Sequence, residues 1–201
     1  LIAKGGAPDM AHQQMDAGNF IIERYGIRWL EDLGADNYDL PGFWDSKDGG
    51  KRWNYFRNTN YSHNTLIINN DKQCVSGRAY VMDKVESKKQ TSVAIDLTSV
   101  YQKDADRVIR RFSLSNKGLM IVGDSIYLKD AEGTVCWNAV TSSKVLLDGK
   151  KAVLEKDGKK FVLQILSPKN AKFSTTEAKP LTPFENPVTG YTLLQIRLDD
   201  C

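Results

Sequence analysis

A series of short strand-like segments, each followed by turn residues, constrains the fold of this chain most strongly. The segments are rich in valine, isoleucine, threonine and aromatic residues. They cover residues 19–25, 27–34, 64–70, 78–84, 91–100, 107–114, 118–128, 134–140, 144–149, 151–158, 160–166 and 190–198. Asp148-Gly149 and Asp157-Gly158 stand between such segments, where Asp-Gly pairs are typical of hairpin turns. No segment has a long helical period, so the sequence predicts an all-β fold, a two-layer antiparallel β-sandwich or jelly-roll-like stack.

The composition is that of an ordinary globular protein. The length of 201 residues suits about one domain, so we expect residues 1–201 to form a single unit. Apolar residues make up 41% and charged residues 26%, and no apolar stretch is long enough for a membrane helix. The net charge of +3 is spread over mixed-sign pairs, so the sequence predicts neither a nucleic-acid nor a membrane partner.

The cysteines and the first residues bear on compartment and completeness. Cys74, Cys136 and Cys201 are far apart and odd in number, so the sequence predicts buried free thiols rather than a disulfide framework or a cysteine-rich zinc site. The opening residues, LIAKGGAPDM, contain neither an initiator methionine nor the apolar core of a signal peptide. We therefore expect the chain to be a piece of a longer protein, with any signal peptide upstream.

The long segment of residues 34–60 is rich in aromatic residues, glycine and aspartate. Long loops without secondary structure are usually functional or disordered. Five of its aromatic residues argue against disorder here: Tyr38, Phe43, Trp44, Trp53 and Tyr55. Two interpretations stay open, because such side chains either form the lip of a cleft on which sugars stack or cap one end of the sandwich.

The chain has two histidines, and both stand near acidic residues at predicted strand ends. His12 and Asp16 precede one strand, Asp32 follows the next, and His63 begins another. Imidazole and carboxylate groups suit a borderline divalent cation such as zinc, and they also suit proton transfer. The short spacing typical of zinc motifs is missing, so satisfied polar core residues are the alternative interpretation.

These residues and their neighbours resemble the central β-domain of the heparinase II/III-like polysaccharide lyases. The family pattern H-x-H-x-D-x-G-x-F corresponds to residues 12–20, and W-x-x-D-x-G corresponds to residues 29–34. Its RW-x-x-x-R corresponds to residues 52–57, and its HNTL to residues 63–66. The resemblance is dense up to about Gln73 and generic after about Thr141.

The resemblance implies one part of a larger enzyme. Such lyases combine an N-terminal helical toroid, which carries a catalytic tyrosine, with this β-domain, which closes the cleft. They cleave uronic-acid-containing, heparin- or heparan sulfate-like polysaccharides by β-elimination, in the periplasm or after secretion. The implied partners are therefore an acidic polysaccharide and the toroid of the same parent chain, and we expect the β-domain alone to be inactive. The alternative is a non-catalytic carbohydrate-binding or structural β-module.

The same resemblance implies roles for single residues. His12 matches the cleft histidine, which acts as an acid/base or neutralises the uronate carboxylate. The positions of a structural metal are Gln14, Asp32 and His63, with zinc expected first and calcium or manganese as alternatives. Glutamine stands where the family commonly has histidine. Three states therefore stay open: a weakened or different metal, a metal-free polar cluster, and a normal zinc with glutamine as ligand.

Three further residues lie close to these motifs. Tyr55 and Arg57 are candidate substrate-binding residues, because a guanidinium pairs with uronate or sulfate groups through a bidentate fork. The alternative for Arg57 is an ion pair that anchors a loop. Asp16 precedes a glycine and a strand, which is typical of a residue that accepts hydrogen bonds in a turn.

Overall fold

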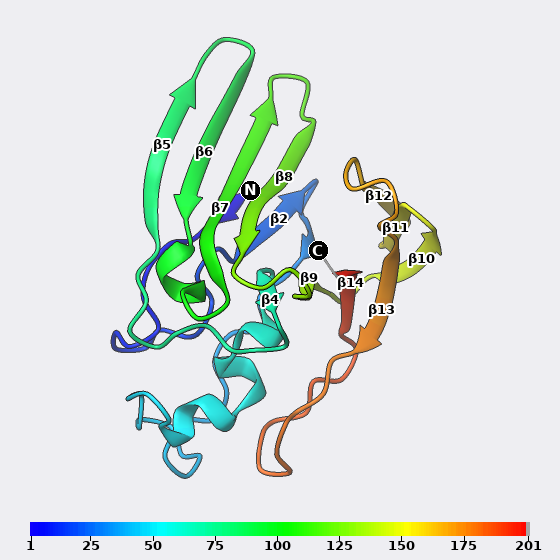
Figure 1. Ribbon diagram of the computed structural model, residues 1–201. Coiled ribbons are helices and arrows are strands. Elements are labelled where there is room, and N and C mark those ends of the chain that lie inside the picture. The colour runs from blue at the N-terminus through cyan, green and yellow to red at the C-terminus, as the bar shows by residue number, and fades with distance from the viewer. Residues whose placement is uncertain (200–201) are drawn as a thin grey trace.

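The computed structural model describes residues 1–199, and in this range it contains fourteen strands and four short 3-10 helices (Figure 1). The strands are β1 (Ile2–Ala3), β2 (Phe20–Arg24), β3 (Ile27–Leu30), β4 (Leu66–Ile68), β5 (Tyr80–Glu86), β6 (Gln90–Asp96), β7 (Ala105–Ser115), β8 (Met120–Leu128), β9 (Val135–Thr141), β10 (Lys144–Asp148), β11 (Lys151–Lys156), β12 (Lys159–Gln164), β13 (Phe173–Glu177) and β14 (Thr192–Leu198). The 3-10 helices are η1 (Lys51–Asn54), η2 (Phe56–Asn58), η3 (Asn60–Ser62) and η4 (Thr98–Tyr101).

The strands form four antiparallel sheets. Their orders are β5-β6-β7-β8, β13-β14-β9-β4, β1-β2-β3 and β10-β11-β12. Figure 1 shows the hairpins of the first sheet extending to one end, whereas η1 to η3 and the segment between β13 and β14 lie toward the other. The prediction of an antiparallel β-sandwich is confirmed.

Two hairpin turns sit next to the Asp-Gly pairs, with different geometries. Between β11 and β12 the turn residues are Asp157 and Gly158, both with positive φ (50° and 70°), as a type I′ turn requires. Between β10 and β11, Asp148 pairs with Lys151, so Gly149 is the first turn residue and has φ 54°. Glycine at that first position is typical of a type II′ turn, and Asp148 belongs to the strand.

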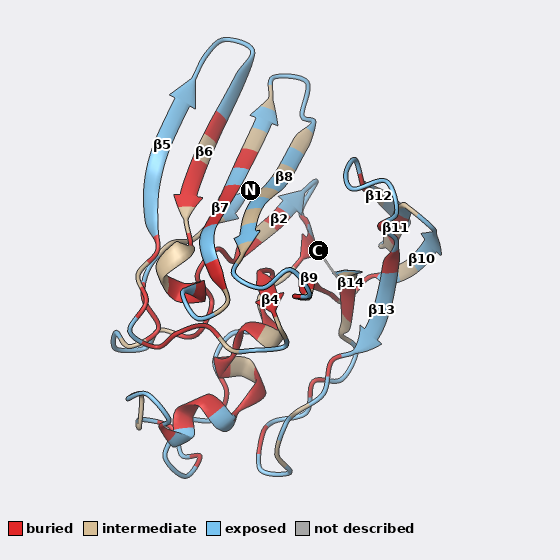
Figure 2. Cartoon of the chain, in the orientation of Figure 1, coloured by how far each residue is buried: buried red, intermediate tan, exposed pale blue. Residues whose placement is uncertain are grey.

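One hydrophobic core joins the sheets. Buried side chains such as Phe20, Trp29, Phe112 and Leu194 come from β2, β3, β7 and β14. The ring of Trp29 stacks on that of Phe161 in β12, with centroids 5.5 Å apart and planes 19° from parallel. Figure 2 shows this burial where the sheets meet, whereas β5 is exposed along its length.

Four segments differ from the sequence prediction, the first of which is the two-residue strand β1, which was not predicted. The strand predicted for residues 91–100 ends at Asp96, whose carboxylate accepts the backbone N–H of Thr98 (2.8 Å) and starts η4. Strand β13 was not predicted, because Phe173 is its only buried residue. Strand β13 is instead defined by its antiparallel pairing with β14, which the sequence pattern does not reveal. Residues 34–60, expected to be a loop, contain η1 and η2.

The structure also shows where two of the cysteines lie and whether a described helix could span a membrane. Cys74 and Cys136 are buried free thiols, as predicted, and Cys201 lies outside the described residues. Burial raises the pKa of the Cys136 thiol to about 11. Within residues 1–199, no helix is long and apolar enough to cross a membrane.

Candidate functional site

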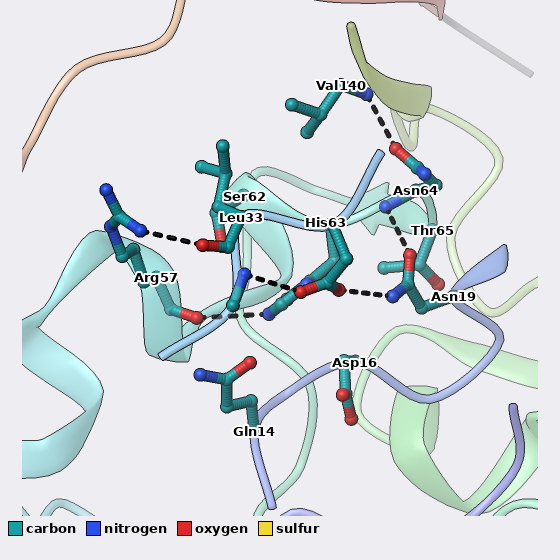
Figure 3. Close-up of polar contacts among 12 residues, drawn as sticks. Gln14, Asp16, Asn19, Leu33, Arg57, Ser62, His63, Asn64, Thr65 and Val140 are labelled. Atoms are coloured by element: carbon teal, nitrogen blue, oxygen red, sulfur yellow. Dashed lines mark hydrogen bonds and ion pairs between the residues drawn. The ribbon is translucent and has the colours of Figure 1, made fainter. Parts of the chain in front are cut away.

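The motif segments meet beside β4, where the fully buried side chain of Asn64 joins several of them (Figure 3). Its Nδ2 donates to the carbonyl oxygens of Phe20 (2.6 Å) and Glu31 (2.9 Å). Its Oδ1 accepts the backbone N–H of Val140 (2.6 Å), and its own backbone N–H donates to Oδ1 of Asn19 (2.8 Å). Because a buried amide that loses its partners is costly, the asparagine of HNTL holds together β2, β9 and the residue that follows β3.

Asp32, which is partly buried, and the fully buried His63 form a pair next to this network. Nδ1 of His63 lies 3.0 Å from Oδ2 of Asp32, and the histidine side chain is fully buried. The same carboxylate accepts Nδ2 of Asn19 (2.6 Å) and the backbone N–H of Gly34 (2.7 Å). On the other side of the imidazole, Nε2 donates to the carbonyl oxygen of Arg57 (3.1 Å). Two of the predicted metal residues are thus in contact.

The contacts of His63 define its charge. A carbonyl oxygen only accepts, so Nε2 carries a proton, and an ionised Asp32 requires a second proton on Nδ1. Burial alone lowers the pKa of His63, but the hydrogen bond and the charge of Asp32 raise it overall. Burial likewise opposes ionisation of Asp32, but the hydrogen bond and charge of His63 lower its pKa far below the usual range. The arrangement suits an imidazolium beside a carboxylate.

Gln14, the third predicted metal residue, makes a different contact. Its Nε2 donates to Oδ1 of Asn58 (3.3 Å), and Figure 3 shows it apart from the dashed contacts of the pair. Within residues 1–199, no three His, Cys, Asp or Glu side chains form a cluster suited to a metal ion. A zinc site needs a deprotonated imidazole and three or four protein ligands. The present hydrogen bonds do not fit that donor set, and the metal stays a prediction.

The two predicted substrate-binding residues are engaged by the protein itself. The guanidinium of Arg57 donates to the carbonyl oxygens of Leu33 (2.7 Å) and Pro187 (3.2 Å) and lies 3.7 Å from Asp36. The hydroxyl of Tyr55, a buried residue, donates to the carbonyl oxygen of Pro41 (2.5 Å). These contacts favour the anchoring role for both residues, and substrate binding stays a prediction.

His12 is exposed and has an unusual backbone. Its φ of 61° lies in the left-handed region, which non-glycine residues seldom occupy. Its ring lies edge-on to the indole of Trp44, with centroids 5.3 Å apart, and 6.1 Å from the ring of Tyr38. Strained residues of this kind concentrate at functional sites. The structure therefore presents a histidine, free to meet a ligand, beside aromatic rings.

The five aromatic residues singled out in segment 34–60 divide into two groups. Phe43, Trp53 and Tyr55 are buried, which is the capping interpretation. Trp44 and Tyr38 are 56% and 46% exposed, so of these residues only they stay candidates for a lip. Burial thus separates the two groups, which the sequence pattern alone had no signal to do, and the lip of a cleft stays a prediction.

Asp16 occupies the turn position that the sequence predicts. Its backbone oxygen accepts the N–H of Asn19 (2.9 Å), and its carboxylate accepts Nζ of Lys4 (2.6 Å). This is a turn held by an ion pair, which agrees with the structural interpretation of Asp16.

The sequence pattern favours a solvated sheet face for Arg107, Arg110 and Arg111, but Arg110 is buried and contacts two motif segments. Its side chain is fully buried and forms a bidentate pair with Asp124, with contacts of 2.7 and 2.9 Å. Its Nη1 donates to the carbonyl oxygens of Gly18 (2.9 Å) and Asn64 (3.0 Å). The only sequence signal was a charged residue at an inward position of a predicted strand. Arg110 thereby joins the sheet of β7 and β8 to two motif segments.

The chain is similar to known proteins in sequence and in fold. The chain belongs to the heparinase II/III-like C-terminal family, whose model matches residues 1–193. A mutant of the heparan sulfate lyase HepC from Pedobacter heparinus matches 99% of the chain with a TM-score of 0.68 and 16% identity. HepC from the same organism matches 92% with a TM-score of 0.66 and 14% identity. At these identities the likeness is one of fold.

The family assignment agrees with the resemblance seen in the motifs. The chain spans 32% and 30% of the two lyase chains, about a third of their length. A comparison with curated proteins finds no match.

Proposed function

We propose that this chain is the β-domain of a lyase that cleaves a uronic-acid-containing polysaccharide by β-elimination, and that it is inactive by itself. Family membership supports the reaction class, and the fold shared with two heparan sulfate lyases supports a heparan sulfate-like substrate. The observation that carries the proposal is the exposed His12, held at φ 61° beside exposed aromatic rings.

The reaction requires a proton to leave C5 of the uronate while the C4 oxygen departs. A base takes the C5 proton, the electron pair forms the C4–C5 double bond, and the C4–O bond breaks. The leaving oxygen then receives a proton from an acid. An imidazole can both accept and donate a proton, so His12 is suited to act as a base or an acid. It is equally suited to pair with the uronate carboxylate, where charge develops in the transition state.

The second catalytic group belongs to a tyrosine outside this chain in our proposal. Acid and base act on different atoms of the substrate, and His12 is the one exposed imidazole that the described residues supply. We therefore assign the other group to an N-terminal helical toroid of the parent chain. The polymeric substrate implies a periplasmic or secreted protein.

Asp32 and His63 have a supporting role in the proposal. Their pair, together with Asn19, holds the turn that leads from β3 against HNTL. A divalent metal, zinc first and calcium or manganese as alternatives, would recruit Asp32, His63 and Gln14 only after His63 lost a proton. Metal analysis of the purified protein, with Asp32→Ala and His63→Ala as controls, tests that state.

A non-catalytic carbohydrate-binding module is the second candidate function. The contact of Gln14 with Asn58 favours it, since the family position commonly holds histidine. A binding module keeps the exposed aromatic rings and needs no proton transfer.

Assays on the full-length parent protein and on this chain alone decide between the two. Each is incubated with heparan sulfate, another glycosaminoglycan and alginate, and the unsaturated product is followed by its ultraviolet absorbance. We expect product from the parent protein on one class of uronate polymer and none from the isolated chain. A parent protein that binds these polymers without forming unsaturated product would establish the binding module instead.

A further inference from the structure

We propose that Trp44 and Tyr38 form a platform beside His12 that binds one sugar ring of the substrate chain. This inference rests on the proposed function and deepens it by naming a binding subsite. More than half of Trp44 and nearly half of Tyr38 is exposed, whereas the neighbouring Phe43 is only 1% exposed. The platform is therefore the outward part of a cluster that is otherwise packed.

The cluster underneath holds the platform rigid. The ring of Phe43 lies 5.4 Å from Trp44 and 4.9 Å from Tyr38, and the two exposed rings lie 5.2 Å from each other. The steep angles of 79° and 71° at Trp44 are the edge-to-face geometry that aromatic pairs prefer. A rigid aromatic surface loses little conformational entropy when a ligand binds, which increases affinity.

Arg52 fastens the platform to the segment that carries His12. Its guanidinium lies 4.5 Å from the centre of the Phe43 ring and donates to the Phe43 carbonyl oxygen (2.9 Å). Its other terminal nitrogen donates to the carbonyl oxygen of Gln13 (2.7 Å), the residue after His12. One buried side chain thus fixes the platform and the histidine relative to each other, as a subsite next to a reacting group requires.

The chemistry of the platform fits a sugar better than a protein partner. Two rings with an adjacent imidazole offer an area far below that of a stable protein interface. Tryptophan and tyrosine combine an apolar face with a polar edge, and a pyranose ring combines apolar C–H faces with polar hydroxyls. A ring stacked on Trp44 lies next to His12 and places the adjoining uronate within its reach.

The test measures binding apart from turnover in the full-length parent protein. The His12→Gln variant serves as a background that binds without cleaving, and a heparan sulfate hexasaccharide and an alginate hexasaccharide are the probes. Calorimetry compares this background with added Trp44→Ala, Trp44→Phe or Tyr38→Ala. Tyr127→Ala, a change at a tyrosine of β8 that is 61% exposed, is the matched control.

We expect Trp44→Ala to raise the dissociation constant of the bound probe about tenfold, with Trp44→Phe intermediate and Tyr127→Ala unchanged. With His12 restored, Trp44→Ala should raise KM more than it lowers kcat.

Affinity within twofold of the background for both Trp44→Ala and Tyr38→Ala would overturn the platform, while cleavage by the parent protein would leave the function standing. Loss of binding in Trp44→Ala, in a parent that never cleaves, would support the platform and contradict the lyase. A parent that neither binds nor cleaves the probes would overturn both.

Discussion

At the scale of the residue, side chains that are close together in one sequence motif differ in exposure and in hydrogen-bond partners. His12 and Gln14 are two positions apart, yet the first is exposed beside Trp44 and the second donates to Asn58. Their motif predicts that both matter, but it contains no information about which one faces solvent. That distinction comes from contacts with residues 38–58, which are distant in the sequence.

The pair of Asp32 and His63 leads to a prediction about stability. Asp32→Asn leaves a buried imidazole without its counter-charge, so we expect the free energy of unfolding to fall by about 3 kcal/mol near pH 6. Urea unfolding followed by tryptophan fluorescence, with a chelator present, measures the difference. Asp83→Asn, which breaks the exposed pair with Arg111, is the control and should change stability by less than about 1 kcal/mol.

The pH dependence of this difference has a defined sign. The folded-state pKa of His63 is raised, so its contribution is complete below about pH 6.5 and is lost as pH rises through the folded value. The folded-state pKa of Asp32 is lowered, so its contribution is present above about pH 4 and is lost as pH falls. The wild-type advantage over Asp32→Asn should therefore be greatest between these limits. An advantage that grows steadily above pH 7 would contradict the ion pair.

At the scale of the element, a strand could be predicted where apolar and polar residues alternate or where turn residues flank it. It could not be predicted where only pairing with a neighbouring strand defines it. Strands β7 and β8 and the hairpin of β11 and β12 follow from local pattern and from Asp157-Gly158. Strand β13 does not, because four of its five residues are exposed and its order depends on β14. The 3-10 helices η1 and η2 are equally invisible to periodicity, since each is too short to repeat.

Turn geometry gives a prediction for one hairpin. Gly158 has φ 70° and open space around it, so Gly158→Ala should cost about 1 kcal/mol through backbone strain alone. Gly123, in β8, also has open space but no positive φ. Gly123→Ala should therefore be neutral or slightly stabilising, and thermal unfolding compares the two. An equal loss in both variants would contradict the assigned turn.

Arg110 gives a prediction for the link between elements. Arg110→Lys removes the bidentate pair with Asp124 and at least one bond to the carbonyl oxygens of Gly18 and Asn64, so we expect a loss of about 3 kcal/mol. Arg111→Lys, one residue along the same strand but exposed, should cost less than about 1 kcal/mol. Urea unfolding measures both. Similar losses in the two variants would show that burial of Arg110 is not what matters.

At the scale of the molecule, the sandwich brings together segments that lie 76 and 92 residues apart in the sequence. The side chain of Asn64 bonds to Val140, and that of Arg110 to Gly18, so the later strands hold the earlier motifs in place. The order of the motifs predicted the family, and the series of strand-like segments predicted the fold class. Which aromatic residues and which arginines are exposed and which are buried could not be predicted, because burial depends on the complete assembly of sheets.

The measurement that tests the account most directly is the turnover of the full-length parent protein with His12→Ala, on the uronate polymer that it cleaves. We expect kcat to fall by about a hundredfold to ten-thousandfold, the range typical of a lost acid/base group, with folding and binding of the polymer retained. The control is Tyr127→Ala, which should keep wild-type turnover. Turnover of His12→Ala within twofold of wild type would contradict the central claim that this histidine is the contribution of the β-domain to catalysis.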